Sequence, residues 1–282
     1  MTENIQITAD STCDLSPELI KQHNILINPL YIVKGDQSYK DGLEISPEDI
    51  YAYFDETGNV TKTSASSVED YRALFAPLVE QGKSVIHVNI SHGFSSCFQN
   101  ACIAAEEFEN VHVVDSMNLS TGSGHIVLKA AELSEQGMPA AQVAEQVRRL
   151  APKVEASFVI DTLTYLHKGG RCSSVAALGA NLLKLKPCIE VMDGKMHVGK
   201  KFRGALIKCM EEYVIQRLKD REDIDYSRIF ITHTSCPPEI VARVRQLVEQ
   251  YGPFQEVIET VAGCTITSHC GPHTLGILFL RK

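Results

Sequence analysis

The chain has 282 residues, of which 44% are hydrophobic and 22% are charged, as in ordinary soluble globular proteins. Its formal net charge of -8 argues against general nucleic-acid binding, which requires a positive surface. No apolar run approaches the ~20 residues that span a bilayer. The first residues, MTENIQITADST, have neither the basic nor the apolar segment of a secretory signal. We therefore expect a cytoplasmic protein without stable membrane insertion.

The first half of the chain alternates between short apolar runs and helical patterns. The runs rich in β-branched residues are IQITA, ILINPLYIV, VIHVNI and VHVVD, at residues 5–9, 25–33, 85–90 and 111–115. Ser46-Pro47-Glu48-Asp49 is typical of a helix start, as is either Ser66 with Glu69 or Ser67 with Asp70. Strands that alternate with helices predict an α/β domain, with a mostly parallel sheet covered by helices on both faces.

The second half has a different pattern. A helix is expected over 139–151, followed by the strand SFVIDTL and an apolar helix over 174–185. Residues 187–199 predict a β-hairpin, with Asp193-Gly194 as its two-residue turn. A long helix over 204–219 precedes RIFITHT, PPEIVARVRQLVEQYG, EVIETV and LGILFL, which predict strand, helix, strand and strand. We therefore expect two domains, 1–152 and a C-terminal α+β domain over 153–282.

The turn after VIHVNI raises a question about Ser95. The stretch Gly93-Phe94-Ser95-Ser96-Cys97 resembles the G-x-S-x-G turn that presents a hydrolase serine, but Cys97 stands in place of the second glycine. A serine hydrolase that uses Ser95 is therefore one alternative. If a strand precedes the turn and a helix follows it, Ser95 instead lies at a helix N-cap, beside N–H groups that bind carboxylates and phosphates.

Two further hydroxyl-rich segments have a similar position. Residues 61–67, TKTSASS, open a predicted helix, and a loop from Asp115-Ser116 to Gly122-Ser123-Gly124 follows a predicted strand. The G-x-G of this loop lacks the third glycine of a dinucleotide-binding motif, so no such cofactor is expected. The segments either only cap helices or converge at one edge of the sheet. Convergence would predict a small anionic head group bound by neutral donors.

The cysteines and the basic residues each allow two interpretations. Nine cysteines form no C-x-x-C pair, which favours reduced core residues. Cys264, His269, Cys270 and His273 match no usual zinc spacing, and a metal or redox site at 264–273 is a second alternative. Between Lys168 and Lys208, nine basic and two acidic side chains give a net charge of +7. This stretch is either a solvated face or a docking site for an acidic partner or phosphorylated ligand.

Several motifs occur in a specific order along the chain. They are Asp10-Ser11-Thr12-Cys13-Asp14-Leu15, Tyr39-Lys40-Asp41-Gly42, Thr63-Ser64, Ser91 through Gln99, Asp115-Ser116, Leu163 through Arg171, and His269-Cys270-Gly271-Pro272. Together they resemble the DegV family of bacterial fatty-acid-binding proteins over essentially the whole chain. The resemblance implies a two-domain α/β protein that binds one long-chain fatty acid between its domains, is not itself an enzyme and needs no cofactor. Some members present the lipid to the separate ATP-binding subunit of fatty-acid kinase, which phosphorylates its carboxylate.

The resemblance also implies roles for individual residues. The carboxylate ligands would be Thr63, Ser95 and His269, with Ser64, Ser96 and Arg171 near the head group. The kinase subunit would dock at Arg203, Lys200 and Lys201.

The chain departs from the family at three places around this site. The family commonly has Ser-Gly-Thr in place of Ser95-Ser96-Cys97, T-S-Q-P in place of Thr63-Ser64-Ala65-Ser66, and glycine at His273. Because all three surround the expected head group, a variant acid or a partner other than the kinase is an alternative.

Overall fold

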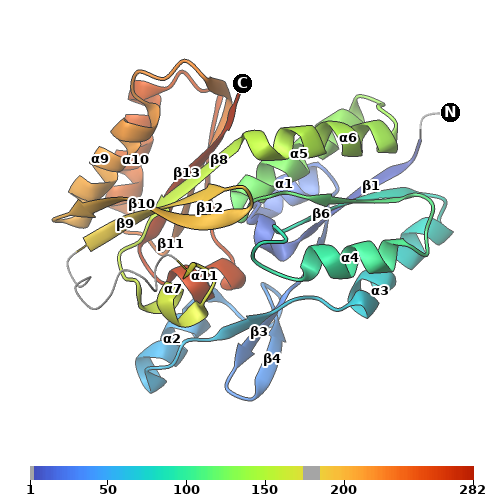
Figure 1. Cartoon of the computed structure of the whole chain (residues 1–282), viewed down its shortest axis with the longest axis horizontal. Coiled ribbons are helices and arrows are strands. Elements are labelled where there is room, and N and C mark those ends of the chain that lie inside the picture. Colours follow the sequence, from blue (N-terminus) through green and yellow to red (C-terminus); the bar gives the residue numbers. More distant parts are fainter. Residues whose placement is uncertain (1–2, 174–184) are drawn as a thin grey trace.

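The computed structural model describes residues 3–173 and 185–282 (Figure 1). The helix expected over 174–185 lies outside these residues except for Leu185, which begins a strand. The elements before residue 154 are β1 (Ile5–Asp10), η1 (Ser11–Cys13), α1 (Pro17–Gln22), β2 (Leu26–Asn28), β3 (Tyr31–Lys34), β4 (Gln37–Lys40), α2 (Pro47–Thr57), β5 (Lys62–Ser64), α3 (Val68–Glu80), β6 (Ser84–Asn89), α4 (Cys97–Ala105), β7 (Val111–Asp115), α5 (Thr121–Glu135), α6 (Ala140–Leu150) and η2 (Ala151–Lys153). The later elements are β8 (Val154–Val159), α7 (Thr164–Gly169), β9 (Leu185–Met192), β10 (Lys195–Arg203), α9 (Leu206–Leu218), β11 (Ile224–Thr234), α10 (Pro238–Tyr251), β12 (Glu256–Val261), α11 (Cys264–Cys270) and β13 (Thr274–Arg281).

A parallel sheet forms the centre of the N-terminal half. Its strand order is β2-β1-β6-β7, with α5 and α6 on one face and α3 and α4 on the other (Figure 1). Both predicted helix starts form capping boxes, Ser46 with Asp49 and Ser67 with Asp70. Ser67, rather than Ser66, therefore begins the second helix. The predicted α/β class is confirmed.

The apolar run at 25–33 forms two strands instead of one. β2 pairs with β1 in the parallel sheet, whereas β3 is the central strand of a small antiparallel sheet, β4-β3-β5. Pro29 lies between them, and its missing N–H group and fixed φ prevent one continuous strand. The change of sheet is important for function, because β5 carries Thr63.

The C-terminal half forms a mixed sheet of order β10-β9-β8-β13-β11-β12. The predicted hairpin is present as β9 and β10, and both turn residues, Asp193 (φ 50°) and Gly194 (φ 72°), have the positive φ of a type I′ turn. Helices α9 and α10 cover one face of the sheet (Figure 1). The other face packs against α5, where His125 Nε2 lies 3.0 Å from the carbonyl oxygen of Leu278.

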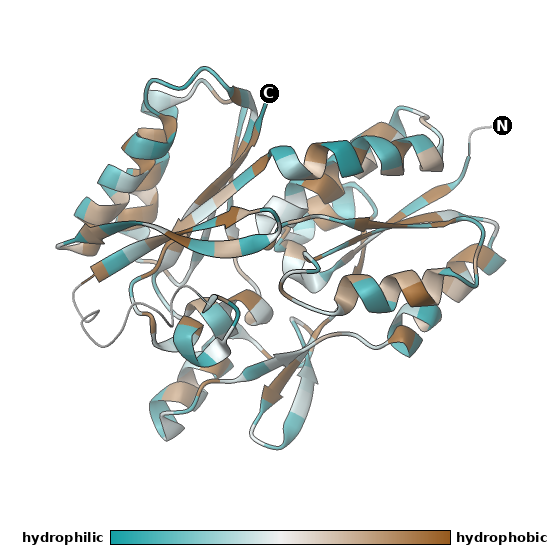
Figure 2. Ribbon diagram, in the orientation of Figure 1, coloured by the Kyte–Doolittle hydropathy of each residue, from teal (hydrophilic) through white to brown (hydrophobic). Residues whose placement is uncertain are grey.

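The hydrophobic core continues between the two sheets. One cluster of buried side chains includes Ile86 and Val88 of the parallel sheet together with Phe158, Phe230 and Leu278 of the mixed sheet. Figure 2 shows the hydrophobic strands and the more hydrophilic outer faces of the helices. None of the helices in the described residues is long and apolar enough to cross a membrane. No two strands of the described residues pair across position 152.

Candidate functional site

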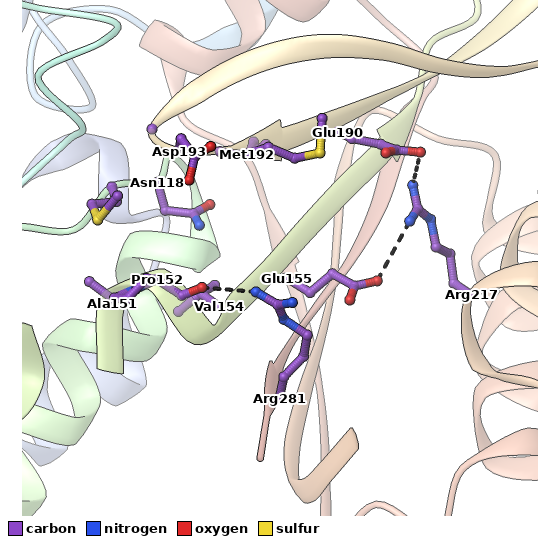
Figure 3. A pocket seen from close by; sticks show the side chains of 13 residues that line it. Asn118, Ala151, Pro152, Val154, Glu155, Glu190, Met192, Asp193, Arg217 and Arg281 are labelled. Atoms are coloured by element: carbon purple, nitrogen blue, oxygen red, sulfur yellow. Dashed lines mark hydrogen bonds and ion pairs between the residues drawn. The ribbon is translucent and has the colours of Figure 1, made fainter. Parts of the chain in front are cut away.

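A cavity of about 330 Å³ contains none of the predicted site residues (Figure 3). It lies beside the hairpin turn, and most of its charged side chains have partners. Arg217 pairs with Glu190 and, at 3.6 Å, with Glu155, while Arg281 donates a 2.9 Å hydrogen bond to the carbonyl oxygen of Pro152. The charges of Arg217, Glu155 and Glu190 thus offset one another, and the predicted head-group residues lie elsewhere.

A smaller cavity, of about 50 Å³, brings together most of the predicted head-group residues. The predicted residues that line it are Thr63, Ser64, Ser95, Arg171 and His269. The remaining lining residues are Leu30, Ala65, Ile90, Phe94, Leu119, Met196, Thr265, Ile266 and Cys270. Ser96 is not part of this lining. We call this space the head-group cavity.

Thr63 and His269 form the centre of the head-group cavity. Thr63 Oγ1 of β5 lies 2.8 Å from Nε2 of His269 in α11, and Thr61 Oγ1 lies 2.7 Å from Ser268 Oγ beside it. The second ring nitrogen of His269 is buried and has no hydrogen-bond partner in the described structure. A Cβ at Gly169 would lie 2.3 Å from that nitrogen, so only glycine leaves room for the ring.

His269 is neutral at physiological pH. Burial, with a smaller contribution from the positive charge of Arg171, lowers its pKa to about 4. A neutral imidazole accepts through one nitrogen and donates through the other. With the ring proton on Nε2, His269 donates to Thr63 Oγ1 and leaves the Thr63 hydroxyl free to donate, without a full charge beside it.

The structure corrects the predicted position of Ser95. α4 begins at Cys97 and its N-cap is Ser96, whose side chain makes no capping bond. Ser95 Oγ instead accepts a 3.3 Å hydrogen bond from the backbone N–H of Cys97 and donates one of 3.1 Å to the Cys97 thiol. Burial raises the pKa of this thiol to about 12, and a neutral thiol is a weak acceptor. A ligand oxygen can readily replace it as the acceptor for Ser95.

The third hydroxyl-rich segment contributes Leu119 to the head-group cavity, but none of its hydroxyl groups. Gly122-Ser123-Gly124, predicted as part of a loop, lies within the first turn of α5. Ser116 Oγ pairs with Ser123 Oγ at 2.8 Å, and the carboxylate of Asp115 pairs with His92. Only two of the three predicted segments bring hydroxyl groups to the cavity, because α5 begins close behind β7 and Ser116 and Ser123 bond to each other there.

The tip of the hairpin borders the head-group cavity, a feature that sequence reasoning missed. Ser91 Oγ donates a 2.8 Å hydrogen bond to the carbonyl oxygen of Gly194. A Cβ at Gly93 would lie 2.2 Å from the same oxygen. Met196, two residues beyond Gly194, lines the cavity. The turn that carries Ser95 thus supports the hairpin, although no pattern in the sequence indicates this contact.

Neither alternative chemistry has the required geometry. A serine nucleophile needs a histidine base that an acid orients, but Ser95 contacts the Cys97 thiol, and His269, the histidine that lines the same cavity, contacts Thr63. In segment 264–273, Cys264 donates to the carbonyl oxygen of Ile45 at 3.2 Å, and His273 faces Asp161 at 3.4 Å. Within residues 3–173 and 185–282, no three His, Cys, Asp or Glu side chains group as metal ligands would.

A second small cavity, of about 30 Å³, adjoins the first. Leu119, Ile266 and Cys270 line both. Behind them the second cavity is bounded by side chains of the mixed sheet, including Ala156, Phe158 and Leu278. We call it the inner cavity. A ligand that passes these three shared residues would lie between the two halves of the molecule.

Some of the predicted basic stretch is paired within the protein. Lys186 pairs with Asp161, Lys208 with Glu211, and Lys168 donates to the carbonyl oxygen of Gly58. Lys184 lies outside the described residues. The predicted docking residues Lys200, Lys201 and Arg203 are exposed on β10. Lys200 lies over the ring of Phe202 at 4.9 Å, and the described residues include no carboxylate paired with any of the three.

Known proteins are similar to this chain over nearly its whole length. Residues 4–282 match the model of a family described as "Uncharacterised protein, DegV family". A DegV domain-containing protein of Clostridium acetobutylicum is 32% identical over 283 residues, which cover 99% of each chain. A solved structure from Thermus thermophilus, described as fatty acid binding of a DegV family protein, has 30% identity, a TM-score of 0.90 and coverage of 99% of this chain and 100% of that one. Another from Thermotoga maritima, described as revealing fatty acid binding function, has 27% identity, a TM-score of 0.84 and coverage of 99% of both chains.

Proposed function

The chain belongs to the DegV family, and we propose that it binds a single long-chain fatty acid whose carboxylate is held by Thr63, Ser95 and His269. The observation that carries this proposal is the convergence of these side chains, from β5, the turn after β6 and α11, on one cavity. The relatives from Thermus thermophilus and Thermotoga maritima are described as binding fatty acids, which supports the same ligand class here.

The polar groups of the head-group cavity fit a carboxylate. A buried carboxylate is costly unless hydrogen bonds replace its hydration. The hydroxyls of Thr63 and Ser95 supply two donors. Arg171, which lines the cavity and donates to the carbonyl oxygen of Gly169 at 2.9 Å, supplies a positive charge. Because Arg171 is exposed, the buried contacts to the carboxylate come from neutral donors, and a later reaction would not have to break a buried ion pair.

The apolar chain of the ligand would occupy the space behind the head group. From Thr63 and Ser95 it would run between Leu119, Ile266 and Cys270 into the inner cavity. Each methylene removed from water there contributes ~0.8 kcal/mol. Affinity would therefore come mainly from the chain, and selectivity for an acid from the head-group cavity.

This proposal is tested by extraction of the purified protein. We expect protein from a bacterial host to carry about one fatty acid per chain, as detected by native mass spectrometry and by analysis of denatured extracts. The protein should retain the lipid during purification, because release would return the apolar acyl chain to water. A folded protein that carries no acyl chain, and binds none when it is added, would refute the proposal.

We also propose that the protein presents the bound carboxylate to a separate ATP-dependent kinase subunit for acyl-phosphate formation. Lys200, Lys201 and Arg203 form an exposed basic edge on a chain with a net charge of -8. Arg203 is seven residues beyond Met196, roughly 20 Å at the usual rise of a strand. Arg203 is thus too far along β10 to act on the reacting carboxylate, and its proposed role is electrostatic attraction of an acidic kinase surface.

Changing Arg203 to alanine should therefore slow acyl-phosphate formation by roughly three- to fivefold, the effect of an exposed charge pair worth about 1 kcal/mol. Fatty-acid affinity should not change, and added salt should reduce the difference between the variant and the parent protein. The measurement is a coupled assay with the kinase beside a lipid-binding assay. Arg149→Ala on α6, which removes an exposed arginine that pairs with Glu145, is the matched control. Equal losses in both assays, or no response to salt, would contradict docking.

A further inference from the structure

Two of the sequence motifs have no role in the site described above, yet both place an aspartate against the start of α11. Asp41 of Tyr39-Lys40-Asp41-Gly42 accepts hydrogen bonds from the backbone N–H of Cys264 (2.9 Å) and Thr265 (3.2 Å) and from the Thr265 hydroxyl (2.6 Å). Asp14 accepts from the backbone N–H of Gly263 (2.8 Å) and from Ser120 Oγ (2.5 Å).

Both carboxylates are buried without a counter-ion. Asp14 is 6% and Asp41 is 4% exposed, and neither forms an ion pair with any residue that the structure describes. They lie on the same side of Gly263, where an added Cβ would be 3.2 Å from an oxygen of Asp14 and 3.5 Å from one of Asp41. Burying two neighbouring carboxylates with only neutral donors costs desolvation free energy, which a helix attachment alone does not require.

These two aspartates connect the segments that surround the head-group cavity. Ser11 Oγ donates to Asp41 at 2.9 Å, which ties the pair to η1. Ser120, held by Asp14 at a φ of 52°, directly follows Leu119, which lines both cavities. α11 itself contributes Ile266, His269 and Cys270 to the lining. A shift at its first residues would be transmitted along a helix of only seven residues to His269.

We infer that Asp14 and Asp41 are positioning residues, which hold α11 against η1 and the start of α5 and thereby set His269 opposite Thr63 for carboxylate binding. This inference rests on the proposed fatty-acid binding. It assigns no contact between either aspartate and the ligand. It predicts that the pair affects recognition of the carboxylate more than recognition of the acyl chain.

The pair should also make the site sensitive to pH near neutrality. Burial raises the pKa of Asp14 to about 7, and the charge of Asp41 adds a smaller contribution in the same direction. The other titratable groups that face Asp14 are the thiols of Cys13, Cys264 and Cys270, whose pKa values burial raises to about 12. No cation therefore offsets the second negative charge that appears as pH rises through 7. We expect the attachment of α11 to weaken over that interval.

The same shift has a defined effect on stability. The folded protein keeps a proton on Asp14 that the unfolded chain releases above its ordinary pKa of 3.8. The folded state thus binds more protons between about pH 4 and 7, and its free energy of unfolding falls as pH rises through that window. The difference in stability between the parent protein and Asp14→Asn isolates this contribution from that of other groups.

The test compares ligands that differ only in the head group. Delipidated full-length protein is titrated with palmitic acid and with hexadecanol, which has the same chain but no carboxylate. We expect Asp41→Asn to weaken binding of the acid at least tenfold and of the alcohol less than threefold, since an amide nitrogen cannot accept from Thr265 or Ser11. Between pH 6 and 8 the parent protein should lose affinity for the acid severalfold, and Asp14→Asn should remove this dependence. Asp36→Asn, an exposed aspartate in the turn before β4, is the matched control.

The outcomes separate this inference from the proposed function. If the parent protein binds neither ligand, fatty-acid binding itself is wrong. The positioning role is overturned if the parent protein binds both ligands and Asp41→Asn lowers the affinity for the acid and for the alcohol equally. It is also overturned if Asp41→Asn changes neither affinity. Should Asp41→Asn fail to fold, Ser11→Ala is the second variant, because it removes a single donor to Asp41. It must weaken binding of the acid more than binding of the alcohol, by a smaller factor than Asp41→Asn would.

Discussion

Replacing both Thr63 and Ser95 with alanine is expected to abolish fatty-acid retention while the protein remains folded. Each hydroxyl would supply a charge-assisted hydrogen bond worth ~1.5–3 kcal/mol. If the two contributions were additive, loss of both would increase the Kd by roughly a hundredfold to ten-thousandfold, which is an upper limit for the double variant. The fold should persist, because Thr63 and Ser95 lie at the surface of a cavity and not in the hydrophobic core.

The two single variants should differ in their effects. Thr63 also contacts His269 at 2.8 Å, so Thr63→Ala removes a donor and releases the ring that orients it. Ser95→Ala removes a donor whose present partner is the Cys97 thiol and leaves the Thr63–His269 pair intact. We therefore expect the larger loss from Thr63→Ala, with a combined effect that is not the sum of the two because the groups share one ligand.

The measurement is the Kd of delipidated protein for a long-chain fatty acid, with thermal denaturation to confirm the fold. Thr63→Ser keeps the hydroxyl and should retain most of the affinity. If the double variant binds as tightly as the parent protein, the head group lies elsewhere. The cavity of about 330 Å³ that contains Arg281 would then become the candidate.

The parts of the molecule that the sequence predicts correctly are those with local signals. Ser67 and Asp70 specify a helix start within four residues, and Asp193-Gly194 specifies the hairpin turn between its two flanking strands. The head-group cavity was accessible through the resemblance, because Thr63, Ser95 and His269 lie within ordered motifs. Local chemistry and a familiar motif order were sufficient for these features.

The features that sequence reasoning missed depend on contacts between distant segments. α11 has seven residues, three of them threonine or serine and two cysteine, and no helical period distinguishes it from a loop. The N–H of Gly263, directly before α11, donates to Asp14, 249 residues away, and His269 of α11 contacts Thr63 across 206 residues. β5 is likewise only three residues long and exists through its pairing with β3. No window of the sequence contains both partners of these interactions.

The contact between the hairpin tip and the Ser95 turn also joins distant segments, and a single methyl group should disrupt it. Gly93→Ala would place a Cβ 2.2 Å from the carbonyl oxygen of Gly194 and 3.1 Å from Cγ of Lys195. The obstacle is backbone, so the tip must move by more than 1 Å to reach an ordinary contact of 3.4–4 Å. That movement breaks the hydrogen bond from Ser91 Oγ to Gly194. We expect a loss of about 1–3 kcal/mol in the free energy of unfolding, as for other overpacked sites.

The displaced tip should affect ligand release more than folding. The cavity of about 330 Å³ borders Met192, Asp193 and Gly194 (Figure 3), so the tip has room to move without disturbing the mixed sheet. Met196 would then withdraw from the head-group cavity and open it to water. We expect the dissociation rate of the fatty acid to rise about tenfold, equivalent to 1.4 kcal/mol, as measured by transfer of a fluorescent fatty acid to acceptor vesicles.

Gly199→Ala in the same hairpin is the matched control for this mechanism. Its Cβ would also meet an atom at 2.2 Å, but that atom is Oε1 of Glu190, at the end of a flexible side chain. Glu190 can rotate away at the cost of its ion pair with Arg217, a loss of about 1 kcal/mol or less, and the tip stays in place. Gly199→Ala should therefore leave the dissociation rate nearly unchanged. Equal rates for the two variants would mean that the hairpin tip does not close the cavity, and that Gly93 serves only to let the two backbones approach.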